Sequence, residues 1–343
     1  MSVYEKILGQ DKLIEHFRKS VSLGKISNAY IISGEKYSGK KMLANAYAAS
    51  IECENPVNGE ACMECHSCKM SLSGNNPDIR WIVRESKDNK DGTKKKAKEI
   101  PVDAIRDQIN NDIVVKPYHC KKKVYIIDEA ETLNVAAQNA LLKTMEEPPE
   151  YGVVILLTSN ENALLQTILS RSIRLEVASI DDETIKDYLM KHNMIPDYAA
   201  DVLVSFARGN LGRAIELSQS PTFNEMKDHL VKTMSFLHEK DMAEIGNITK
   251  QTSEFKDDIN YYFELLTMWF RDILVAKSGG DESKIIFRDE VENIRELSRG
   301  YSYRSIEMIL KTIEDTKTQI ALNVSFDTAF KILYMTIRDG YIR

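Results

Sequence analysis

Long hydrophobic runs are absent from this sequence. The longest apolar stretch, residues 153–157, is far too short to cross a bilayer. Residues 1–6 do not contain the apolar core that is typical of a signal peptide. We therefore expect a cytosolic protein that has no membrane partner.

An excess of positive charge is also absent. The 46 Lys and Arg residues are outnumbered by 52 Asp and Glu residues, and the net charge is −6. This balance argues against a chain that binds nucleic acid through its overall electric field. Basic runs at residues 94–96 and 121–123 are most simply solvated loops or strand edges. Any contact with DNA would be local.

The length and composition are those of a globular protein with more than one domain. A chain of 343 residues predicts two or three domains. Its hydrophobic content of 43% and charged content of 29% are ordinary for such proteins. No internal repeat is visible.

Residues 34–41, Gly-Glu-Lys-Tyr-Ser-Gly-Lys-Lys, fit the phosphate-loop pattern G-x-x-x-x-G-K. An apolar run at 29–32 predicts a buried strand before them, and residues 42–48 predict a helix after them. Backbone N–H groups, the helix dipole and the Lys40 charge would then converge on phosphate oxygens. An ordinary glycine-containing turn is the alternative. The candidate nucleotide-binding residues are Gly34, Ser38, Gly39, Lys40 and Lys41.

The loop departs from the pattern at its last position. A Ser or Thr hydroxyl normally holds the magnesium ion there, and Lys41 has no hydroxyl. Its ammonium group would lie where the metal should be. The sequence thus predicts a site that takes ATP or ADP but has lost or weakened its hydrolytic half, with Mg²⁺ binding doubtful.

Polar side chains follow two further predicted strands. Residues 123–127 are apolar after Lys123 and end in Asp128 and Glu129, which could orient a metal and polarise an attacking water. A strand capped merely by acidic residues is the alternative. The strand at 153–157 is followed by Asn160, which could sense a γ-phosphate. Alternating strands and helices with polar strand ends predict a parallel α/β sheet that holds its ligand at the carboxyl edge.

Four of the five cysteines lie within sixteen residues, with the spacing C-x8-C-x2-C-x2-C. In a cytosolic chain this clustering favours a metal over disulfides. Cys53, Cys62, Cys65 and Cys68 could close a structural tetrahedral zinc site, with His66 as a less favoured ligand. Incidental reduced thiols and an iron–sulfur cluster are weaker alternatives. Cys120 stands alone and is expected to be an ordinary buried or half-buried thiol.

The carboxyl-terminal half is predicted to be helical. Ser179 and Asp182 fit a capping box that opens a helix through Met190. Beyond residue 221, apolar residues recur at helical spacing, and we interpret them as the core of a bundle: Ile259, Phe263, Leu266, Phe270, Ile273 and Leu274; Ile306, Ile309, Leu310 and Ile313; Phe326, Phe330, Leu333 and Ile337.

Taken together, the motifs resemble the clamp-loader branch of the AAA+ family. The segments that carry the resemblance are residues 7–10, 25–30, the loop at 34–41, the four cysteines, residues 74–78, 128–130, 137–149, 170–172 and 212–214. Of these, residues 137–149 are the most specific. Ser170-Arg171-Ser172 is similar to the family motif Ser-Arg-Cys, with Ser172 in place of the cysteine.

The resemblance implies an architecture in three parts. It implies a P-loop AAA+ domain at 1–165, with a parallel sheet flanked by helices and a zinc-module insertion at 53–68. A small helical lid would follow at 166–220, and an all-helical collar for oligomerisation at 221–343.

It also implies roles for two arginines. Arg171 would be an arginine finger that acts in trans on a neighbouring ATPase subunit. Arg213 would contact nucleotide phosphates, or form a structural salt bridge if no nucleotide binds.

The implied function is that of a subunit that does not hydrolyse ATP. It would belong to a pentameric ring with the delta and gamma/tau loader subunits and help to load the sliding clamp onto primed DNA. One alternative is that the chain is itself the ATP-hydrolysing motor of such a loader, against which Lys41 argues. A second, a DNA-processing AAA+ motor outside replication, is disfavoured by the four cysteines and by the segment around Arg171.

Overall fold

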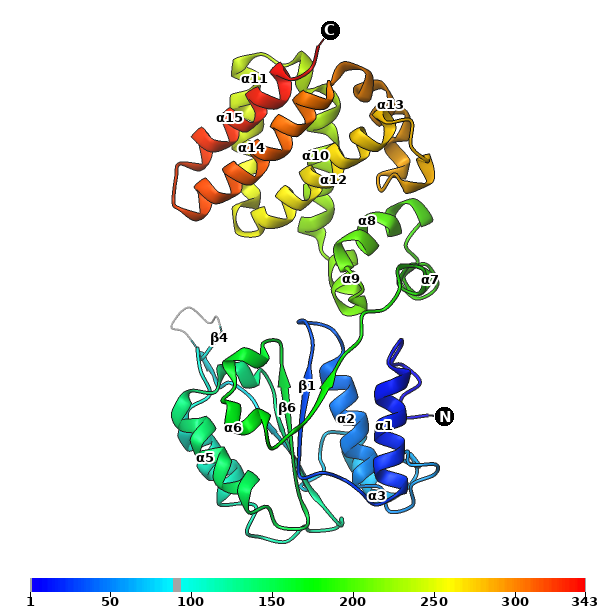
Figure 1. Ribbon diagram of the computed structural model, residues 1–343, viewed down its shortest axis with the longest axis vertical. Helices are drawn as coiled ribbons and strands as arrows, with labels where there is room; N and C mark the ends of the chain where they lie inside the picture. Colours follow the sequence, from blue (N-terminus) through cyan, green and yellow to red (C-terminus); the bar gives the residue numbers. More distant parts are fainter. Residues whose placement is uncertain (1, 89–93, 343) are drawn as a thin grey trace. The chain divides into compact units, whose positions relative to one another are not determined.

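The structure is a computed structural model that describes residues 2–88 and 94–342, without the side chains of residues 86–96 and 282. The chain divides into two compact units, Met1–Ile180 and Asp181–Arg343. Figure 1 shows the α/β character of the first unit and the helical character of the second. The first unit extends beyond residue 165, the predicted end of the AAA+ domain, because residues 173–176 form a strand of its sheet. The division of the remaining residues into a lid and a collar stays a prediction.

The first unit is built on a five-stranded parallel sheet, as expected. Its strand order is β2-β5-β6-β1-β7. The strands are β1 (Ala29–Ser33), β2 (Ile79–Ile82), β5 (Lys123–Ile127), β6 (Gly152–Thr158) and β7 (Ile173–Glu176). The central strands β1, β5 and β6 are buried along their whole length, so they read in the sequence as continuous apolar runs.

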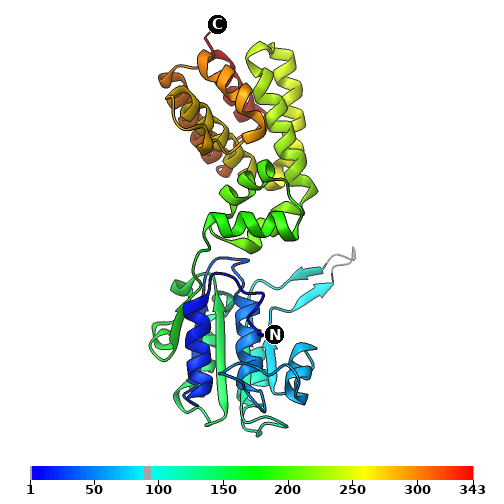
Figure 2. The same ribbon diagram turned by 90° about the vertical axis from the view of Figure 1, so that its right-hand side faces the viewer.

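Successive residues of these strands enter opposite layers of the core. Tyr30 and Ile32 pack in one layer with α1 (Asp11–Ser22) and α2 (Lys40–Ile51). Ile31 packs in the other layer with α5 (Val135–Glu146) and α6 (Gln166–Leu169). Helices therefore cover both faces of the sheet, as Figure 1 shows and as the view in Figure 2 supports.

Smaller elements complete the first unit. They are α3 (His66–Leu72), α4 (Val102–Ile105), a π-helical turn at Arg106–Asn110, and 3₁₀ turns at Ala130–Thr132 and Glu161–Ala163. Strands β3 (Ser86–Asp88) and β4 (Lys94–Lys96) pair in antiparallel fashion. The basic run at Lys94–Lys96 therefore lies on a strand, and its side chains lie outside the described residues.

The second unit is helical throughout its described residues. It contains α7 (Asp182–His192), α8 (Asp197–Ala207), α9 (Leu211–Ser218), α10 (Pro221–Phe236), α11 (Met242–Thr252), α12 (Ile259–Lys277), α13 (Val291–Gly300), α14 (Tyr303–Ala321) and α15 (Phe326–Asp339). Short 3₁₀ turns lie at Leu237–Glu239, Ser253–Asp258, Glu282–Lys284 and Arg288–Glu290. In the described part of the chain, no helix is both long and apolar enough to span a bilayer.

The predicted apolar stripes form much of this unit's core. Phe263, Phe270, Ile309 and Leu333 are all buried. The predicted start of α7 is wrong by two residues. Asp181, not Ser179, is the N-cap, and its carboxylate accepts the backbone N–H of Thr184.

Asp272 is a buried carboxylate that holds a loop of the second unit. Its Oδ2 accepts the backbone N–H groups of Ile286 and Phe287 at 2.8 and 2.9 Å. Replacing Asp272 by Ala leaves these donors without their partner, and we expect the free energy of unfolding to fall by about 3 kcal/mol. Urea denaturation measures this change. The exposed Asp289→Ala is the control and should change stability by less than about 0.5 kcal/mol. Equal stabilities of the two variants would contradict the prediction.

Candidate functional site

The loop between β1 and α2 has the geometry of a phosphate-binding loop. Gly39 is the N-cap of α2 and adopts a left-handed conformation with φ of 88°, which a glycine adopts at little cost. The Lys40 ammonium donates to the carbonyl oxygens of Gly34 and Glu35 at 2.7 and 2.6 Å. Lys40 is thus held at the mouth of the loop. Burial lowers the pKa of Lys40, and nearby carboxylates such as Glu131 and Asp128 oppose this shift.

A cavity of about 690 Å³ opens beside this loop at the carboxyl edge of the sheet. It is lined by Lys36, Tyr37, Ser38, Gly39, Lys40, Lys41, Met42, Arg84, Asp128, Glu129, Glu131, Leu157 and Ser159. The structure therefore brings together most of the nucleotide-binding residues predicted from the sequence. It also adds Arg84 and Glu131, which the sequence analysis missed.

Lys41 and Asp128 form an ion pair within this cavity. The Lys41 ammonium lies 2.7 Å from Asp128 Oδ2. The lysine side chain is 62% exposed, whereas that of the aspartate is 8% exposed. In a magnesium-dependent phosphate loop, this carboxylate and a loop hydroxyl orient the metal. Here a cationic side chain of the protein neutralises the carboxylate.

The second carboxylate is also engaged. Arg84 Nε donates to Glu129 Oε2 at 2.7 Å, and this hydrogen bond raises the pKa of Arg84. Glu129 has a left-handed backbone, with φ of 52°. A carboxylate that accepts a hydrogen bond from a guanidinium is a weaker general base, because the bonded oxygen is less free to take a proton.

Asn160 does not line the cavity. Its side-chain oxygen accepts the backbone N–H of Asn162 at 3.1 Å, so it caps the short turn after β6. The neighbouring Ser159 lines the cavity instead, and its hydroxyl donates to Glu131 at 2.6 Å. The role of Asn160 as a phosphate sensor stays a prediction.

Arg171 lies at the other edge of the sheet. It lines a hollow of about 530 Å³ together with Asn28, which directly precedes β1, and its guanidinium lies 2.9 Å from Glu146. The loop at Gly34 directly follows β1. Five strand residues separate the two positions by about 16 Å. Arg171 therefore cannot reach the cavity of its own chain.

Arg213 belongs to the second unit. Its guanidinium lies 3.6 Å from the Glu264 carboxylate and over the ring of Tyr261, with 5.8 Å between the guanidinium carbon and the ring centroid. Arg213 thus forms a salt bridge within the second unit, and its contact with nucleotide phosphates stays a prediction.

Two lysines of the Lys121–Lys123 run make contacts within the first unit, whereas Lys121 is exposed. Lys123 is 1% exposed, and its ammonium lies 3.0 Å from Asp112. Lys122 donates to the carbonyl of Glu150 at 2.5 Å. Both side chains make contacts beside the start of β5, as expected for a basic run at the edge of a strand.

The four clustered cysteines come together as expected. One sulfur from each of Cys53, Cys62, Cys65 and Cys68 lies within 4.8 Å of all the others. The sulfurs of Cys62 and Cys68 are 3.9 Å apart. A tetrahedral zinc ion with Zn–S bonds of 2.3 Å requires about 3.8 Å between sulfurs. This donor set therefore fits zinc.

Backbone N–H groups prepare these sulfurs for a cation. Cys53 Sγ accepts the N–H of Cys62, Cys62 Sγ that of Cys65, and Cys65 Sγ that of Cys68, at 3.2–3.4 Å. Backbone hydrogen bonds from Glu64 and Cys65 lower the pKa of Cys62 to about 7. Burial raises the pKa values of Cys53 and Cys68. A bound dication would shift the whole set toward thiolate.

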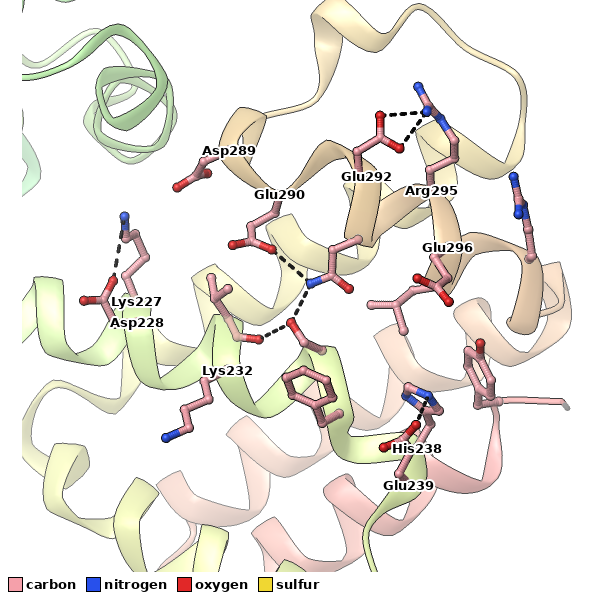
Figure 3. A pocket seen from close by; sticks show the side chains of 17 residues that line it. Lys227, Asp228, Lys232, His238, Glu239, Asp289, Glu290, Glu292, Arg295 and Glu296 are labelled. Carbon is pink, nitrogen blue, oxygen red and sulfur yellow. Dashed lines mark hydrogen bonds and ion pairs between the residues drawn. The ribbon is translucent and has the colours of Figure 1, made fainter.

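Another groove, of about 1030 Å³, lies in the second unit along α10 and α13. Figure 3 shows that some of its charged side chains pair with one another, as in the ion pair between Arg295 and Glu292, while others such as Lys232 and Asp289 have no marked contact. None of the residues predicted from the sequence to form a site lines it. The groove is therefore separate from the candidate site.

The parallel sheet, the loop after β1 and the acidic pair after β5 together define a P-loop nucleotide-binding fold of the AAA+ class. Residues 9–181 match the family described as DNA polymerase III, delta subunit, and the chain belongs to this family of clamp-loader subunits.

The chain is also similar to individual proteins. DNA polymerase III subunit delta' of Bacillus subtilis is 26% identical over 334 residues, which cover 96% of this chain and 97% of the relative. DNA polymerase III subunit tau of the same organism is 27% identical, over 95% of this chain but only 60% of its own length. A gamma subunit-related protein from Thermotoga maritima superposes with a TM-score of 0.43 at 18% identity, covering 96% of this chain and 99% of its own.

Proposed function

We propose that this chain acts as the delta prime subunit of a DNA polymerase III clamp loader and does not itself hydrolyse ATP. The observation that carries the proposal is the ion pair between Lys41 and Asp128. It places a fixed ammonium where the hydrolytic reaction needs a magnesium ion. The full-length similarity to a delta' subunit supports the same role.

The phosphate loop and Arg171 lie at opposite edges of the sheet and would have different roles. Gly34, Ser38, Gly39, Lys40 and Lys41 would bind the phosphates of ATP or ADP without Mg²⁺. Arg171 would reach the ATP of a neighbouring subunit, because its own cavity lies at the far edge. Asn160 and Arg213 would act as nucleotide sensors.

The proposed partners are those of a clamp loader. The chain would join delta and gamma/tau subunits in a pentameric ring and act with them on the sliding clamp and primed DNA. The part of residues 166–220 that follows the first unit would form the lid, and residues 221–343 the collar. The four cysteines would hold a structural Zn²⁺.

The alternative is an ATP-hydrolysing motor subunit, similar to gamma or tau. It is favoured by the open 690 Å³ cavity, which retains the loop, Asp128 and Glu129. It is also favoured by the similarity to a tau subunit.

Calorimetric titration of the chain with ATP separates the two functions. We expect weak binding or none, with the same affinity with and without Mg²⁺, because Lys41 already neutralises Asp128. The variant Lys41→Thr supplies a hydroxyl and frees Asp128. It should gain at least tenfold in affinity when Mg²⁺ is added, or about 1.4 kcal/mol.

Lys19→Thr is the matched control. It removes the same charge from an exposed ion pair with Glu15 in the same unit, and it should behave as the parent chain does. Tight, magnesium-dependent binding by the parent chain would contradict the proposal. The motor function would then be preferred, with Asp128 and Glu129 as candidate catalytic residues.

A further inference from the structure

Three elements of the first unit bring Glu52, Asp78 and Cys120 together. Glu52 directly follows α2, Asp78 directly precedes β2, and Cys120 lies three residues before β5. One donor atom from each residue lies within 4.8 Å of the other two. The sequence analysis assigned no function to any of them and expected Cys120 to be an ordinary thiol.

Glu52 is the anomaly in this cluster. The residue is 2% exposed, and in the described part of the chain no N–H or O–H group donates to either carboxylate oxygen, so that only the weakly donating Cys120 thiol interacts with it. A buried polar group without a partner costs free energy, and most such groups are satisfied in native proteins. A cation held between the three side chains would bind one of these oxygens and balance the charge of the carboxylate.

The rest of the cluster is already oriented. Asp78 Oδ2 accepts the backbone N–H groups of Tyr118, His119 and Cys120, and Oδ1 accepts that of Tyr118. These bonds fix the loop that carries Cys120. Oδ1 keeps a second lone pair, because it accepts only one of these bonds. Hydrogen bonds of this kind position ligands in metal sites.

We propose that Glu52, Asp78 and Cys120 bind a second metal ion, a divalent transition metal such as Zn²⁺, separate from the one held by the four cysteines. A thiolate with two carboxylates favours zinc over Mg²⁺ or Ca²⁺, which prefer oxygen ligands alone. Bond lengths of 2.0–2.3 Å would place the donors about 3.3–3.7 Å apart, within the observed limit.

A fourth ligand for the metal ion is available in α3 (His66–Leu72). The Ser67 hydroxyl lies 3.1 Å from Cys120 Sγ and belongs to α3, which also carries Cys68. A water molecule could fill the same position. The metal would therefore join the four-cysteine module to the edge of the sheet at β2 and β5.

Zinc counting on the full chain tests this site. The protein is saturated with Zn²⁺, desalted and analysed by elemental mass spectrometry. We expect two zinc ions per chain for the parent protein and one for Cys120→Ala. Glu52→Gln, which keeps the side-chain shape, should weaken the second zinc at least tenfold in a chelator competition.

Glu54→Gln is the matched control. It removes the same charge two residues away from an exposed residue whose carboxylate accepts the backbone N–H of Ser67. It should leave two zinc ions bound. If circular dichroism shows that Cys120→Ala does not fold, the zinc affinity of Glu52→Gln alone tests the proposed site. Zinc content and affinity equal to the parent's in both Cys120→Ala and Glu52→Gln would overturn the proposal and assign the cluster to protonated, metal-free side chains.

Discussion

Replacing Arg171 by alanine in a reconstituted clamp loader is expected to leave the complex assembled and to depress its ATP turnover. An arginine finger that acts in trans contributes about 10³–10⁵ in rate, which corresponds to roughly 4–7 kcal/mol of transition-state stabilisation. The loss should fall on the one site that faces this chain. The ATP turnover of the whole complex should therefore fall by the fraction that this one site contributes. Single-turnover hydrolysis measures the effect, and gel filtration measures assembly.

Two further variants sharpen this experiment. Arg171→Lys keeps the charge but loses the planar guanidinium, so it should remain slow. Arg174→Ala removes an exposed arginine that pairs with Glu161 in the same unit, and it should hydrolyse ATP at the parent rate. Unchanged turnover with Arg171→Ala would remove the role in trans. It would leave Arg171 with its Glu146 ion pair as a surface contact.

Removing zinc from the four-cysteine module is expected to unfold that module locally. Structural zinc contributes about 10–16 kcal/mol of apparent binding free energy in zinc-finger peptides. Residues 53–65 contain little regular structure of their own. Without the metal, we expect limited proteolysis between Cys53 and Cys68 to accelerate at least tenfold, a change on the order of 1.4 kcal/mol in the local opening equilibrium. The sheet of the first unit should keep its circular dichroism signal.

The Cys62→Ser variant should reproduce this effect and lose one zinc ion. It removes the thiol whose backbone hydrogen bonds lower its pKa to about 7. Cys120→Ala lies outside the four-cysteine set and should leave the module resistant to protease. A chelator-treated chain with the same cleavage pattern as the parent would show that the four thiols do not depend on metal.

Local patterns in the sequence predicted the centre of the fold well. The loop at 34–41 sits between a strand and a helix as expected, because glycine positions and apolar runs act over a few residues. The strand that directly precedes Asp128 and the convergence of four cysteines were predictable for the same reason. Ion pairing of Lys41 with Asp128 followed from chemistry once both lay at one edge of the sheet.

Contacts between distant segments were not predictable in this way. Arg84 reaches Glu129 because β2 pairs with β5, and β2 is only four residues long with a half-buried pattern. The sequence feature that could have indicated Arg84 as a site residue is its position two residues after the end of β2. Glu131 and the Glu52–Asp78–Cys120 cluster depend on how loops fold over the sheet edge. Asn160 lies outside the cavity lining because the chain turns after Thr158.

The placement of Arg171 and the phosphate loop at opposite ends of β1 gives the subunit a direction. Within a ring of such subunits, each chain would face one neighbour with its arginine and the other with its cavity. A chain whose cavity cannot hydrolyse ATP would still complete the ATP site of the neighbour that its arginine faces. The interface with its other neighbour would have no hydrolysing site. The proposed loader would then have fewer working sites than subunits, and this chain would mark where the sequence of hydrolysis events begins or ends.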